Sequence, residues 1–88
     1  MLGQPFTATI QKDEVNSGWT CVIWPESAAV LGTRKAVKTA VRVDGHDFDI
    51  TLMPYGDGTH MVPLRAAILK TIKKQMGDTV EVSVMSRV

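Results

Sequence analysis

The sequence predicts a mainly β single domain over residues 1–88: a six-stranded barrel of two pseudo-symmetric halves, closed within one chain and capped by one long and one short helix. Three observations predict it. Apolar and polar residues alternate with period two along much of the chain, an Asp-Gly dipeptide separates two such runs, and the two halves of the chain resemble each other.

The first apolar run predicts a hairpin over residues 6–24. Phe6, Ala8 and Ile10 share one face of a strand, polar turn formers fill residues 13–18, and a second run extends from Trp19 to Trp24. Pro25 ends that run because it has no N–H for a ladder. Residues 26–31 are long enough for one or two helical turns.

The second hairpin has the clearest local signal. Asp44-Gly45 is a type I′ turn dipeptide, with residues 37–43 before it and 46–53 after it. A two-residue loop places apolar residues opposite one another on one face and opposite charges on the other, with Lys38 diagonal to Asp49. The predicted pairs are Val41–Phe48, Thr39–Ile50, Val37–Leu52 and Arg42–Asp47.

One segment has clear helical periodicity. At about 100° per residue, apolar residues between Leu64 and Met76 fall on one arc, with lysines on the opposite side. Pro63 precedes this helix, and Gly77 is the expected left-handed residue after its end. A last strand follows over residues 79–85, with Val80, Val82 and Val84 facing inward.

Two parts of the chain match each other. Residues 24–31 align with 62–69, sharing a proline, two alanines and a leucine, and residues 6–10 resemble 48–52. We predict an internal repeat of 6–44 and 48–86, each half consisting of a strand, a turn, a strand ending in proline, a helix and a strand. Two such units, related by a pseudo-twofold axis, can close a small barrel.

Several short motifs extend this pattern along the chain. They are Phe6-x-Ala8-x-Ile10, Trp19 followed by Val22 and Pro25, Leu31-Gly32-x-Arg34, Val43-Asp44-Gly45, Phe48, Leu52-x-Pro54-x-Gly56-x-Gly58, Leu64, and Gly77-Asp78-x-Val80-x-Val82. In order and spacing they resemble the bacterial domain-of-unknown-function family nineteen-oh-five. The Pro-helix-Gly-Asp-Val part also resembles AbrB/MazE-type swapped-hairpin barrels. The resemblance implies a double-split β-barrel and no assigned function.

Composition limits the function classes. Ten Lys+Arg against nine Asp+Glu leave a net charge of +1, which excludes the strongly basic class of nucleic-acid binders. One cysteine cannot form an internal disulfide, and with two histidines it cannot complete a zinc site, so we expect no metal and no cofactor. The first five residues lack a signal-peptide pattern and no stretch approaches the roughly 20 apolar residues of a membrane span. We expect a soluble cytoplasmic protein and a monomer.

The loop over residues 54–60 is the main candidate site. Two glycines allow close approach of a ligand, while Tyr55, Asp57 and His60 bring an aromatic ring, a carboxylate and an imidazole together. The alternative is a plain hairpin turn. With an exposed tryptophan beside Arg34 as a further contact point, the predicted ligand residues are Trp24, Arg34, Tyr55, Asp57 and His60. No catalytic residue is predicted. The favoured function is therefore a non-enzymatic module that binds a small ligand or a protein.

Two alternatives stay open. The segments around residues 34–42 and 65–74 carry basic residues without acids, which could contact phosphates as in an AbrB-like DNA-binding regulator. An ordinary solvated surface also explains these charges. The residues concerned are Arg34, Lys38, Arg42, Lys70, Lys73 and Lys74. The second alternative is an enzyme acting on a small molecule at the 54–60 loop.

Overall fold

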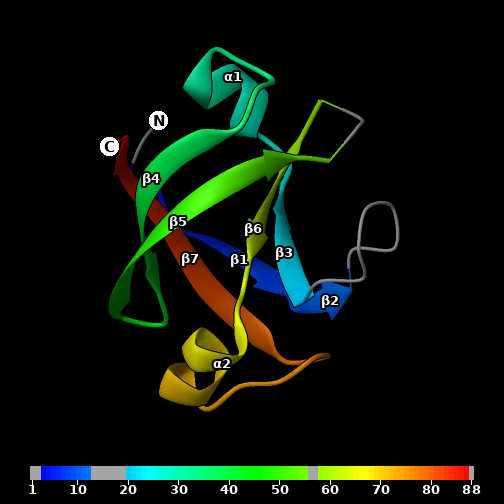
Figure 1. Ribbon diagram of the computed structural model, residues 1–88, viewed down its shortest axis with the longest axis vertical. Helices are drawn as coiled ribbons and strands as arrows, with labels where there is room; N and C mark the ends of the chain where they lie inside the picture. Colours follow the sequence, from blue (N-terminus) through cyan, green and yellow to red (C-terminus); the bar gives the residue numbers. More distant parts are fainter. Residues whose placement is uncertain (1–2, 13–19, 56–57, 88) are drawn as a thin grey trace.

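The computed structural model describes residues 3–12, 20–55 and 58–87, and in these ranges the chain forms seven strands and two short helices (Figure 1). The strands form one sheet in the order β1-β7-β4-β5-β6-β3-β2. The fold is mainly β, as predicted. In chain order, the elements are β1 (Phe6–Thr9), β2 (Gln11–Lys12), β3 (Thr20–Trp24), α1 (Ser27–Leu31), β4 (Val37–Val43), β5 (His46–Pro54), β6 (His60–Pro63), α2 (Ala66–Ile72) and β7 (Thr79–Arg87).

The two outermost strands of the sheet, β1 and β2, are consecutive pieces of one chain segment. β1 pairs with β7 and β2 pairs with β3, both antiparallel. Between them, Ile10 donates its N–H to the Asp78 carbonyl at 2.9 Å and accepts the Gly77 N–H at 2.9 Å. Because this segment reaches both ends of the strand order, the sheet closes nearly into a barrel.

The predicted hairpin over residues 6–24 is therefore wrong in its first half. Only Gln11–Lys12 pairs with β3, whereas Phe6–Thr9 lies beside the C-terminal strand. The strand changes partner at Ile10 because the turn at Gly77 and Asp78 takes up the main-chain groups of that residue. The break also explains why six predicted strands become seven. Trp19 lies outside the described residues.

The hairpin of β4 and β5 confirms the predicted register. Val41 lies opposite Phe48, Thr39 opposite Ile50 and Val37 opposite Leu52. Both turn residues have positive φ, 48° at Asp44 and 84° at Gly45, as a type I′ turn requires. Apolar side chains of this hairpin, of β3 and β6, and of β7 fill the interior together with both helices. The predicted inward valines of β7 are buried.

The helix predicted over residues 64–76 is shorter than expected. It ends at Ile72, and Lys73 adopts the left-handed conformation (φ 59°) expected of Gly77. The next residues form a turn instead, since Asp78 accepts the Gln75 N–H through its side chain. Met76 leaves the predicted apolar arc and is 52% exposed. Two short helices, α1 and α2, thus lie at opposite ends of the barrel (Figure 1).

Two pairs of strands separate partway along their length: the β1–β2 segment separates from β3, and β5 separates from β6. In the first, β1 leaves β3 after the short β2 pairing. In the second, β6 pairs with β5 only at Met53–Met61 and Pro54–His60, while the rest of β6 stays beside β3. This is the double-split arrangement that the family resemblance implies. Neither of the helices in the described ranges is long and apolar enough to span a membrane.

Candidate functional site

The split between β5 and β6 leaves one edge of β5 unpaired. The two-residue turn makes Val43–His46 a hydrogen-bonded pair, so hydrogen-bonded pairs with β4 recur at every second residue. The main-chain N–H and C=O groups of Asp47, Asp49 and Thr51 therefore point away from β4. No described strand pairs with these residues on that side. On the far wall, Pro63 has no N–H to offer, and Leu64 donates its N–H to the Thr20 carbonyl, away from β5.

A groove of about 550 Å³ occupies this split. Its floor is apolar, because the side chains of Ile50 and Leu64 form it. Both lie deep, at 5% and 3% exposed. Its rims carry opposite charges, Asp49 on β5 and Arg65 just before α2, both exposed. Neither charged side chain forms an ion pair with a described residue. The lining residues are Thr20, Asp49, Ile50, Thr51, Met53, Pro63, Leu64, Arg65 and Ala66.

The first split differs from the second because two aromatic rings stack across it. The rings of Phe6 and Trp24 stack with centroids 5.8 Å apart and planes at 3°. In the repeat alignment Val62 stands where Trp24 does, and no ring stack among the described residues spans the second split. A hollow of about 450 Å³ lies at the first split, beside Trp24, Pro5 and Val30. Trp24, predicted as a ligand residue, is thus an interior residue, because it is 6% exposed.

His60, predicted in a loop, is the first residue of β6 and is fully buried. Its Nε2 lies 2.8 Å from the Lys35 carbonyl, and its Nδ1 lies 2.7 Å from the Ser27 hydroxyl. Since a carbonyl only accepts, Nε2 carries a proton and donates to it, and in the neutral ring Nδ1 accepts from Ser27. His60 therefore joins β6 to α1 and to the segment before β4, and both ring nitrogens are occupied.

The other predicted ligand residues are only partly brought together. Arg34 is exposed, and its guanidinium lies over Gly58, 3.8 Å or more from the position a Cβ would take there. Tyr55 is half-buried and donates its main-chain N–H to the Thr59 carbonyl at 3.0 Å, as in a turn. Asp57 lies outside the described residues. Trp24 and His60 are opposite each other across β3 and β6, but inside the barrel.

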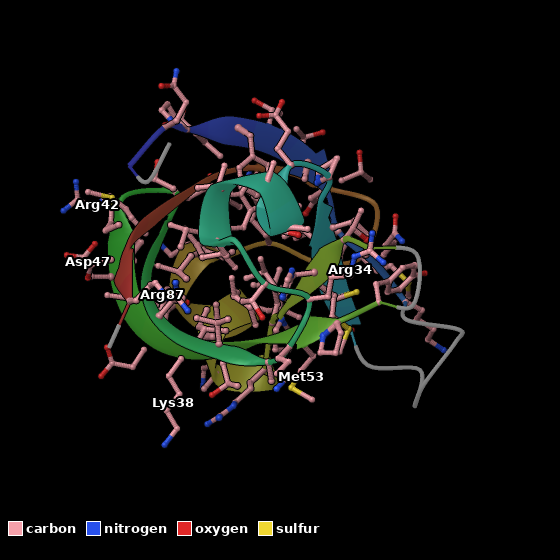
Figure 2. The ribbon with its side chains drawn as sticks, turned by 90° about the horizontal axis from the view of Figure 1, so that it is seen from above. Arg34, Lys38, Arg42, Asp47, Met53 and Arg87 are labelled. Carbon is pink, nitrogen blue, oxygen red and sulfur yellow. The ribbon has the colours of Figure 1, made fainter. Side chains whose placement is uncertain are left out.

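The residues predicted to contact nucleic acid are spread around the molecule. Arg34 and Arg42 lie on opposite sides of the barrel, with Lys38 between them (Figure 2). Lys70 and Lys73 lie at the end of α2. Arg42 is paired with Asp47 at 2.7 Å. The hydrogen bond between them raises the pKa of Arg42 and lowers the pKa of Asp47.

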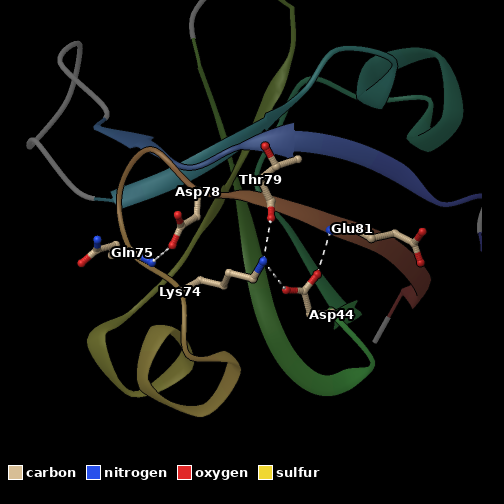
Figure 3. A network of polar contacts seen from close by, with 6 residues as sticks. All are labelled: Asp44, Lys74, Gln75, Asp78, Thr79 and Glu81. Atoms are coloured by element: carbon tan, nitrogen blue, oxygen red, sulfur yellow. Dashed lines mark hydrogen bonds and ion pairs between the residues drawn. The ribbon is translucent and has the colours of Figure 1, made fainter.

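Lys74 belongs to a network that holds the β4–β5 turn against β7 (Figure 3). Its Nζ donates to the Thr79 carbonyl at 3.1 Å and lies 3.7 Å from an Asp44 oxygen. The other Asp44 oxygen accepts the Glu81 N–H at 2.9 Å. These contacts give Lys74 a structural role that its place on a predicted solvated helix face did not indicate.

The groove residues were not among those predicted. Asp49 was expected only in a charge-paired solvent face, diagonal to Lys38. One sequence signal could have pointed to the split. The run ending at Pro63 is short compared with the run after Asp44-Gly45, so the two strands cannot pair over their full length. Among the described residues, no three His, Cys, Asp or Glu side chains lie close enough to hold a metal ion.

Comparison with known families agrees with this fold. A family described as Domain of unknown function (DUF1905) matches residues 6–84. The chain belongs to the DUF1905 family. The resemblance to this family that the motifs indicated is thereby confirmed over residues 6–84 of the chain. No curated protein matches the sequence of this chain.

Proposed function

We propose that this DUF1905 domain is a non-enzymatic binding module that holds its ligand in the groove between β5 and the β6–α2 segment. The groove volume of about 550 Å³ supports this, since ligand sites usually measure about 300–1,000 Å³. An apolar floor with a few polar groups above it is the usual composition of such sites. The single observation that carries the proposal is that Asp49 and Arg65 face this groove without an ion-pair partner among the described residues.

The described lining of the groove includes Thr20, Thr51 and Asp49 but no cysteine, serine or histidine, which favours binding over catalysis. Cys21 lies fully buried in β3, and Ser27 and His60 are fully buried and hydrogen-bonded to each other. A nucleophile must reach the substrate with a base beside it. None of these three lines the groove.

Two neighbouring alanines of α2 provide a matched test. Ala66 lines the groove and Ala67 does not, although both are exposed in the first turn of the helix. Ala66→Trp therefore fills the groove, whereas Ala67→Trp adds the same side chain beside it. Both variants should keep the wild-type melting temperature to within a few degrees, because surface substitutions usually change stability by about 0.5 kcal/mol or less.

The assay is a ¹⁵N NMR titration with two probe sets, small polar metabolites and heptapeptides selected from a randomised library. We expect at least one probe to shift the amide signals of Asp49, Thr51 and Leu64. Its affinity should fall about tenfold or more, 1.4 kcal/mol, in Ala66→Trp and stay unchanged in Ala67→Trp. Binding that maps elsewhere, binding that survives Ala66→Trp, or no binding by either set would overturn the proposal.

A further inference from the structure

We infer that the ligand of this groove is an extended polypeptide segment that adds to the unpaired edge of β5 as an extra strand. This rests on the proposed function and names its ligand class. Asp49 and Thr51 each direct one N–H and one C=O into the groove, and no described strand takes them up. An extended peptide beside such an edge makes the same main-chain hydrogen bonds as a sheet neighbour.

The walls of the groove keep this edge open. β6 ends at Pro63, whose ring nitrogen cannot donate, and Leu64 turns its N–H toward Thr20 of β3. If the far wall moved closer, a ladder with β5 would therefore lack the donor at Pro63. Main-chain groups left unpaired at an edge are ready for a partner strand.

The surfaces around the groove indicate the side chains of that segment. Side chains alternate between the two faces of a strand, so every second residue of the segment faces the floor at Ile50 and Leu64 and is apolar. The residues between them face outward, beside Asp49 on one rim and Arg65 on the other. Opposite charges on neighbouring strands stabilise pairing. We therefore expect both a basic and an acidic residue among the outward-facing positions of the segment, the basic one near Asp49 and the acidic one near Arg65.

A second copy of this chain is a poor occupant. Antiparallel pairing of two β5 edges around Asp49 would place the Asp49 side chains of the two copies opposite each other. Like charges on neighbouring strands destabilise pairing. The edge is therefore suited to a different sequence, with alternating apolar and charged residues.

The experiment starts from the tightest heptapeptide of a randomised phage-displayed library. Two N-methylated versions are synthesised, one methylated at odd residues and one at even residues. Only one set of amides faces β5 in an added strand, so we expect one version to lose about tenfold or more in affinity and the other to lose less. In the complex, amide hydrogen exchange at Asp49 and Thr51 should slow by about tenfold or more.

Two matched aspartates test the charge pairing. Asp49 lines the groove, whereas Asp47 lies on the same face of β5 and is paired with Arg42. Asp49→Asn should weaken binding by about two- to fivefold, as expected for an exposed ion pair, and Asp47→Asn should not change it.

The outcomes separate this inference from the proposed function. If a probe binds in an Ala66→Trp-sensitive way but both N-methylated peptides bind equally, or the Asp49 and Thr51 amides stay fast, strand addition is wrong and groove binding stands. The same holds if only small metabolites bind there. Protection of these amides in a self-associated protein would identify a second copy as the occupant and overturn the inference. If nothing binds in the groove, both proposals fail.

Discussion

The buried hydrogen bond between Ser27 and His60 predicts a large effect for a very small substitution. Ser27→Ala removes one oxygen atom and leaves His60 Nδ1 without its donor, 2.7 Å away in the wild type. Both residues are 0% exposed, so water cannot replace the lost hydroxyl without a rearrangement. A buried polar group left unpaired costs about 1–3 kcal/mol. For a domain of this size each kcal/mol corresponds to about 4–8 °C in melting temperature.

Urea denaturation and thermal melts of wild type, Ser27→Ala and Ser86→Ala measure this. Ser86 is exposed on β7 and provides the same substitution without burial, so its change should stay within about 0.5 kcal/mol. A double-mutant cycle with His60→Leu isolates the pair, because Ser27→Ala should cost much less once Nδ1 is gone. Equal destabilisation by Ser27→Ala and Ser86→Ala would show that the Ser27–His60 hydrogen bond does not stabilise the fold.

Three further predictions concern charge and assembly. The pKa of Asp47 is lower in the folded chain than in the unfolded chain, because of its hydrogen bond with Arg42. The small stabilisation from this exposed pair is therefore present above the unfolded pKa and is lost as pH falls through the folded pKa. Arg42→Gln should raise the pKa of Asp47 in a ¹³C NMR titration, and an unchanged pKa would contradict the pairing. We expect no tight, salt-sensitive binding of duplex DNA in a fluorescence anisotropy titration. Arg34 and Arg42 lie on opposite sides of the barrel, and Arg42 is paired with Asp47. Binding that weakens steeply with salt would instead support the DNA-binding regulator. Light scattering should give a mass near 9.6 kDa, since one chain nearly closes the barrel, and a mass near twice that value would contradict it.

Those parts of the fold that depend on neighbouring residues could be predicted from the sequence. The β4–β5 hairpin is one example, because the Asp44-Gly45 turn and the alternation on both sides fix the same register. The partner change at Ile10 could not be predicted, because it depends on main-chain bonds to Gly77 and Asp78, far along the chain. The early end of α2 has the same origin, since the turn after it is held by contacts outside the helix.

The candidate site was harder to predict than the fold. The groove results from where β6 stops pairing with β5. The short run before Pro63 indicates incomplete pairing, but no local pattern of side chains encodes the point at which it stops. His60 was predicted as a loop residue because its burial comes from α1 and the segment at Lys35, neither of which is near it in sequence. The internal repeat of 6–44 and 48–86 stays a prediction.

The edge of β5 that faces the groove is open, and amide hydrogen exchange of the free protein measures this at single residues. Ile50 and Leu52 are in register with Thr39 and Val37, so their N–H groups are bonded to β4, whereas that of Thr51 faces the groove. We expect the Thr51 amide to exchange about a hundredfold faster than its two neighbours, with Asp49 behaving like Thr51. Equal protection of Ile50, Thr51 and Leu52 would show that this edge is already paired and that the groove offers no open strand edge.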